Sequence, residues 1–164
     1  MRFAHLIFGA LALSAGSARA DDRLFLAGAE YADAAYYTYT GLVLPGPGRE
    51  NGRGFLQRYW LDWFGYEYLG GPGRVEASAW GAEASLGYGA SSADGWWTVW
   101  LGVRHTDTDL TPDDPSAEAR GSQTGAKVQA EFERALSSAW RFGAMGSYAS
   151  QQNGYWGRAR LMYG

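Results

Sequence analysis

The chain contains no cysteine, which excludes both a disulfide framework and a thiolate metal site. Lysine occurs once, at Lys127, and acidic residues outnumber basic ones by 17 to 14, for a formal net charge of -3. A protein that binds nucleic acid needs a basic patch to neutralise phosphates. We therefore expect no nucleic-acid partner, and no motif in the sequence predicts a cofactor.

Long hydrophobic runs are also scarce. The clearest one follows Arg2, covers residues 6–15, and precedes the small residues Ala18 and Ala20. A helical membrane anchor needs about 18 or more apolar residues, whereas a secretory signal peptide has a short apolar region and a small-x-small cleavage site. We predict a signal peptide over residues 1–20 and a mature domain over residues 21–164.

The sequence does contain a repeated alternation of apolar and polar side chains, interrupted by turn-forming residues. Over 125–134, for example, alanine, valine and phenylalanine alternate with lysine, glutamine and glutamate. Side chains on a strand point alternately to its two faces, so a period of two predicts strands. We expect about eight strands, over residues 24–32, 36–44, 55–69, 75–88, 96–105, 125–134, 140–150 and 155–163.

Strand length near ten residues, an aromatic content of 16% and an export signal favour an outer-membrane barrel. We predict an all-β fold, an antiparallel up-and-down β-barrel of about eight strands, closed so that no edge stays unpaired. Outer-membrane lipid would contact its apolar faces, and both chain ends would lie on the periplasmic side. The alternative is a soluble periplasmic β-sandwich that binds polysaccharide, with its apolar faces buried between two sheets.

The same alternation predicts the faces of the second strand, a bulge in the third strand and the position of the longest loop. In the second strand, Tyr37, Tyr39 and Val43 are assigned to the apolar face. Beyond Gly65 the alternation changes phase, which predicts a bulge. The acidic segment 106–123 is expected to form the longest loop, on the external side, because its composition cannot bury apolar area.

Charged residues of both signs collect on the faces opposite the apolar ones. An eight-stranded barrel has an interior just wide enough to be filled by side chains, and buried charges need partners. We therefore predict that ten charges pair with one another in the lumen and plug it. They are Glu30, Arg58, Asp62, Glu83, Arg104, Lys127, Glu131, Glu133, Arg158 and Arg160.

Tryptophan and tyrosine side chains allow two interpretations. Aromatic girdles occupy the two membrane interfaces of outer-membrane barrels, and aromatic rings also stack on sugars. Trp100 falls on the polar face by its phase in the alternation. It is therefore the residue we expect to contact a glucan, if any does.

Two groups of residues near residue 105 could carry chemistry. His105 is followed by Asp107 and Asp109, and a histidine at a barrel rim could activate the hydroxyl of Ser122 or Ser116, as in a lipid-modifying barrel enzyme. The acidic residues Asp107, Asp109, Asp113, Asp114 and Glu118 could instead bind calcium. Their spacing departs from the EF-hand pattern, so we interpret them as a solvated loop, with no catalytic and no metal residue assigned.

Short aromatic and glycine motifs resemble a known family. They are Gly28-Ala-Glu30, Tyr37-Thr-Tyr39-Thr-Gly41, the turn at Pro45, Gly54-Phe-Leu-Gln-Arg58-Tyr-Trp60, Tyr66-Glu-Tyr68 and Ala84-Ser-Leu-Gly-Tyr88. From Leu26 to Tyr68 the chain resembles the cellulose biosynthesis protein BcsS family, of which it would be a short member. The resemblance implies an exported, non-enzymatic accessory of bacterial cellulose biosynthesis or export, with cellulose or the cellulose-secretion machinery as partner. It implies no catalytic residues.

Overall fold

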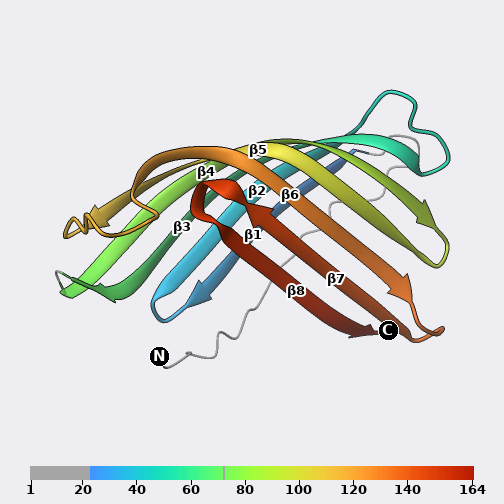
Figure 1. The fold of residues 1–164 in the computed structure, drawn as a ribbon. Helices are drawn as coiled ribbons and strands as arrows, with labels where there is room; N and C mark the ends of the chain where they lie inside the picture. Colours follow the sequence, from blue (N-terminus) through green and yellow to red (C-terminus); the bar gives the residue numbers. More distant parts are fainter. Residues whose placement is uncertain (1–22, 72) are drawn as a thin grey trace.

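A computed structural model describes residues 23–71 and 73–164, which form one eight-stranded antiparallel sheet. Each strand pairs with its neighbours in the sequence, so the up-and-down arrangement of eight strands is confirmed (Figure 1). The strands are β1 (Leu24–Ala32), β2 (Ala35–Pro45), β3 (Arg53–Gly70), β4 (Gly73–Ser92), β5 (Gly95–Thr111), β6 (Gly121–Ala135), β7 (Trp140–Ala149) and β8 (Gly154–Tyr163). A short 3-10 helix, η1 (Ser150–Gln152), precedes β8. The expected signal peptide over 1–20 lies outside the described residues.

The sheet curls into an open half-barrel and is not closed in the described part of the chain. Pairing runs from β1 to β8 in order, and no pairing between β1 and β8 completes a ring. Figure 1 shows these two strands as the free edges of the curled sheet. The expected closed ring is therefore absent here, and so are the two stacked sheets of a sandwich. The described segments also include no helix with the length and hydropathy needed to cross a membrane.

Strand register corrects two details of the predicted faces. Glu30 lies opposite Tyr37, so Tyr37, Tyr39 and Val43 belong to the charged, concave face and not to the apolar one. The pairing of β3 with β4 continues without interruption through Gly65. The expected bulge is therefore wrong, and Tyr66 lies on the concave face because it follows Asp62 by four positions, an even offset.

The segment between β5 and β6 is shorter than predicted. Residues 106–111 continue β5, and 121–123 already belong to β6, which leaves a connection over 112–120. Thr106 and Thr108 are buried, while the aspartates between and after them point to the opposite face. The alternation of threonine and aspartate was itself a strand pattern, which the acidic composition concealed.

The connection from β2 to β3, over residues 46–52, ends in a tight turn. Asn51 and Gly52 both have positive φ, at 50° and 74°, and the backbones of Glu50 and Arg53 bond to each other on either side. Asparagine followed by glycine is the preferred pair for a type I′ hairpin turn, because both positions need φ above zero. This turn lies at the same end of the sheet as the beginning of β1 and the end of β8.

Candidate functional site

The concave face holds the charged residues of the central parts of the strands. By strand register, all ten residues expected to line a lumen lie on this face. The four central strands bury several of their polar side chains, including Arg58, Asp62, Glu83 and Gln129. The geometry of these charges decides what the face can do.

Glu83 is the centre of the largest cluster, which we call the central ion cluster (Arg58, Glu83 and Lys127). Arg58 donates through Nη2 to Glu83 Oε1 at 2.5 Å, and Lys127 Nζ donates to Glu83 Oε2 at 2.5 Å. Ser85 Oγ adds a third hydrogen bond at 2.6 Å. The Glu83 side chain is only 1% exposed, so its charge has almost no contact with water and depends on these partners.

A second ion pair lies beside the cluster. Arg104 holds Asp62 in a bidentate pair, with N–O distances of 2.8 and 2.9 Å. Tyr37 Oη donates to Asp62 Oδ2 at 3.3 Å, and Trp60 Nε1 donates to Tyr37 Oη at 3.2 Å. Gly81 gives this pair its space, because a Cβ at that position would lie 2.4 Å from Asp62 Oδ1.

Toward β7 and β8 the charges are more exposed. Glu133 accepts from Arg141 Nε at 2.8 Å and from Arg160 Nη2 at 3.0 Å, and both arginine side chains keep over 40% of their surface exposed. Arg158 contacts Met145 Sδ and lies over the Trp156 ring, without an acidic partner among the described residues. The side chain of Glu30, on β1, likewise has no ion pair and no hydrogen bond within the described part of the chain.

Trp100 lies inside the charged network and does not project from it. Its side chain is 3% exposed, Nε1 donates to Glu131 Oε1 at 2.6 Å, and the Arg58 guanidinium lies 4.5 Å from the ring centroid. Protein atoms cover the ring that we expected to contact a glucan. The glucan contact stays a prediction, and the observed partners of Trp100 are Glu131 and Arg58.

His105 lies on the convex face, away from the charged network. Its Nδ1 is 2.8 Å from Thr124 Oγ1, and its ring packs against Trp80. Ser122 instead donates to Asp107. The structure therefore does not bring either candidate serine to His105, since Ser116 donates to an aspartate in the β5–β6 connection.

The acidic residues of the β5–β6 connection are engaged with protein groups. Asp113 pairs with Arg120, and Asp114 accepts from Ser116 and from Tyr68 Oη. The hydrogen bond from Ser116 lowers the pKa of Asp114 from its ordinary value. The described ranges contain no group of three or more histidine and acidic side chains placed to hold a metal ion.

Sequence reasoning missed several members of the network. Tyr37 was assigned to the wrong face, and Gln129, which accepts from Arg58, was not singled out. Arg141 was also missed, because the alternation of β7 was not used to phase that strand. An alternation count extended to 140–149 would have placed Arg141 on the same face as Met145 and Ser147.

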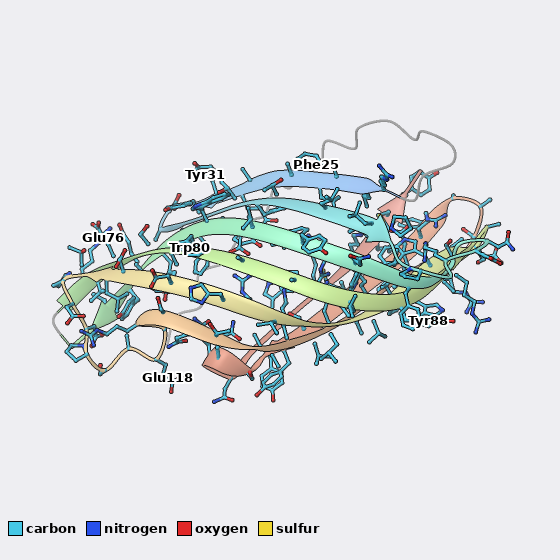
Figure 2. All side chains as sticks on the ribbon, turned by 90° about the horizontal axis from the view of Figure 1, so that it is seen from above. Phe25, Tyr31, Glu76, Trp80, Tyr88 and Glu118 are labelled. Atoms are coloured by element: carbon cyan, nitrogen blue, oxygen red, sulfur yellow. The ribbon has the colours of Figure 1, made fainter. Side chains whose placement is uncertain are left out.

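The convex face is apolar and exposed, with aromatic side chains toward both ends of the strands. In Figure 2, Phe25 and Tyr31 lie toward opposite ends of β1, and Tyr88 and Trp80 lie toward opposite ends of β4. Aliphatic side chains fill the space between, among them Leu61, Leu86, Val99, Leu101, Val103 and Val128, each over 40% exposed. One aromatic row comprises Phe25, Phe55, Tyr88, Trp97, Phe132, Trp140 and Tyr163, and the other comprises Tyr31, Tyr36, Trp63, Trp80 and Tyr155. We call the whole surface the apolar belt.

Acidic side chains on the convex side of the described strands β3, β4 and β5 lie beyond the second aromatic row. Strands β3 to β6 continue past it and carry Glu67, Glu76, Asp107 and Asp109 on their convex side. Figure 2 shows Glu76 farther toward that end of the sheet than Trp80. The belt is therefore bounded by aromatic rings and, at this end, by charge.

Comparisons with known proteins agree with the sequence motifs. The family model described as cellulose biosynthesis protein BcsS matches residues 24–163, which includes every described strand. No curated protein and no solved structure matched the chain in the other two comparisons. The chain belongs to the cellulose biosynthesis protein BcsS family.

Proposed function

We propose that this protein is a non-enzymatic accessory of bacterial cellulose biosynthesis or export, embedded in the outer membrane as a closed β-barrel. Membership of the BcsS family supports the link to cellulose. The apolar belt supports the membrane location, because an exposed apolar surface of this extent is rare on soluble monomers. The belt is the single observation that carries the location.

Belt dimensions suit a bacterial outer membrane. Trp80 and Tyr88 bound it on β4, and eight residues of strand rise by about 26 Å, or roughly 20 Å along the membrane normal at a tilt near 40°. Outer-membrane barrels carry an apolar band of about 25 Å between aromatic girdles, and this membrane is thinner than average. The concave face, opposite the belt, carries charged side chains in ion pairs. Such a polar face suits the interior of an outer-membrane barrel.

Membrane location is tested by fractionating cells that produce the full-length protein. We expect it in the outer-membrane fraction, retained after a carbonate wash and released by detergent. Unheated samples should also migrate differently from boiled ones in an electrophoresis gel, as folded barrels do. Recovery in the soluble periplasmic fraction would refute the location.

The cellulose role is tested by deleting the gene in its own host and measuring cellulase-sensitive glucan. We expect less exported glucan in the deletion strain and recovery with the wild-type gene. A His105→Ala variant should restore export as well as the wild type, because the His105 ring contacts Thr124 and Trp80, and Ser122 and Ser116 donate to aspartates instead. Loss of export with His105→Ala at normal protein level would favour a lipid-modifying enzyme.

A further inference from the structure

We propose that β1 and β8 pair with each other in the membrane, in a register staggered by eight residues, and that Glu30 and Arg158 meet across this seam. The inference rests on the proposed membrane location and goes further by naming the partner of each free edge. An open edge in a bilayer would leave backbone N–H and C=O groups without hydrogen bonds, at a cost of several kcal/mol per group. Both edges therefore require a partner.

Strand register gives the stagger. Straight across the sheet, each residue of one row pairs with the next: Leu24, Val43, Arg58, Ser85, Gly102, Lys127, Ala149 and Gly154. In antiparallel pairing, all nine residues of β1 find partners in β8 when Leu24 faces Met162 and Ala32 faces Gly154. The row that begins at Leu24 in β1 ends at Gly154 in β8, but the proposed partner of Leu24 in β8 is Met162. The stagger is the difference of eight residues between Gly154 and Met162.

A stagger of this size is what closure requires. Strands in a closed barrel must tilt, and the tilt appears as a fixed offset in register. Eight-stranded barrels with an offset of eight and a tilt near 36° are well known among (β/α)8 proteins. The offset is also even, so concave residues of β1 meet concave residues of β8.

One of the two aromatic rows leads independently to the same register. The row at the β1–β2 turn begins at Tyr31 in β1 and ends at Tyr155 in β8. With Leu24 opposite Met162, these two tyrosines face each other on the convex side. The girdle therefore closes on itself, as it must if both ends of the row lie at one membrane interface.

Charge complementarity supports the same partner. Glu30 and Arg158 lie on the concave sides of the two edge strands, and neither has an oppositely charged partner in the described structure. In the proposed register Arg158 faces Gly28, and Glu30 is its diagonal neighbour, within reach of a long side chain. Closure therefore pairs two charges that the open sheet leaves unpaired.

Curvature favours closure within one chain over a larger barrel made from two copies. Arg58 on β3 donates to Gln129 on β6 at 3.3 Å, although these strands are three steps apart, about 14 Å along a flat sheet. Such contacts across the concave face are expected in a narrow, filled barrel and not around a wide channel. The tight curl directs β8 back toward β1 of the same chain.

The absence of native cysteine makes the seam testable by disulfide trapping. Ala29 and Gly157 face each other in the proposed register, as do Ala27 and Ala159, and all four lie on the convex side. The variants A29C/G157C and A27C/A159C, in outer-membrane preparations treated with a mild oxidant, should form a disulfide within one chain. The off-register pair A27C/G157C should cross-link at least several-fold more slowly, because diagonal Cβ atoms lie farther apart.

Three outcomes separate the possibilities. An intramolecular disulfide in both matched pairs supports the seam, whereas a disulfide-linked dimer or no disulfide overturns it. Fractionation of the same samples keeps the two proposals distinct, since a protein found in the outer membrane but not cross-linked contradicts only the seam. As a second measurement, Glu30→Arg should lower the folded fraction, and Glu30→Arg with Arg158→Glu should restore it. Failure of the charge swap to restore folding contradicts the ion pair.

Discussion

Replacing Glu83 by glutamine removes the charge at the centre of the central ion cluster and keeps the shape of the side chain. Arg58 and Lys127 would then lose the carboxylate that both contact at 2.5 Å, while their side chains remain only 7% and 17% exposed. Breaking one buried ion pair typically costs about 3–5 kcal/mol, because the remaining charge stays buried without a partner. We expect a loss of that size in the free energy of unfolding, or roughly two to four powers of ten in the unfolding equilibrium constant.

The assay is equilibrium unfolding by urea of residues 21–164 refolded into lipid vesicles, followed by tryptophan fluorescence. Glu133→Gln is the matched control, since Glu133 pairs with Arg141 and Arg160, whose side chains are 41% and 49% exposed. Exposed pairs contribute about 0–1 kcal/mol, so this variant should be close to the wild type. Glu83→Gln combined with Lys127→Met should recover part of the loss, because fewer cations then lack a partner. Equal stability of the Glu83→Gln and Glu133→Gln variants would refute the view that burial makes the cluster depend on Glu83.

The remaining predictions concern the concave face, the apolar belt and the β5–β6 connection. Gly81→Val should prevent folding, because any Cβ there collides with the neighbouring ion pair, whereas Gly146→Ala, which has open space, should fold normally in the same refolding assay. Leu101→Arg, in the middle of the apolar belt, should lower the free energy of unfolding in lipid vesicles by about 2–4 kcal/mol. The control Ser78→Arg, on the convex side beyond the aromatic row, should lower it by no more than about 1 kcal/mol. Equal losses in the two variants would contradict the assignment of the belt to lipid. Because the folded pKa of Asp114 is lowered, its contribution to stability should be complete above about pH 4 and lost as the pH falls through that lowered value. Protease cleavage within 112–120 measured against pH checks this, and Asp114→Asn should be cleaved faster than the wild type at neutral pH.

The period of two in the sequence was enough to predict most strands and their faces. The clean alternations over 125–134 and 155–163 are β6 and β8, with their charges on the concave side. Prediction failed in β2, where tyrosines occupy both faces and threonine is as good a strand former as tyrosine. There only pairing with Glu30 on β1 decides the face, and pairing is not visible in a single segment.

Which charges meet could not be predicted for a similar reason. Arg58 and Glu83 are 25 residues apart, Glu83 and Lys127 are 44 apart, and Arg58 and Gln129 are 71 apart. Alternation predicts that such residues share a face, but their distances depend on register and curl accumulated over several strands. The packing role of glycines such as Gly81, which makes room for Asp62 and Arg104, could not be predicted either. A glycine in a turn and a glycine in a packed strand are the same letter in a sequence.

Sequential order of the strands has a consequence for how the chain assembles. Every observed strand pairing joins neighbours along the chain, so each can form as a hairpin with a short connection and a small loss of chain entropy. Folding rate falls as contacts become more distant in sequence. Assembly can then advance one hairpin at a time, and only the meeting of the first and last strands would require distant parts of the polypeptide to find each other.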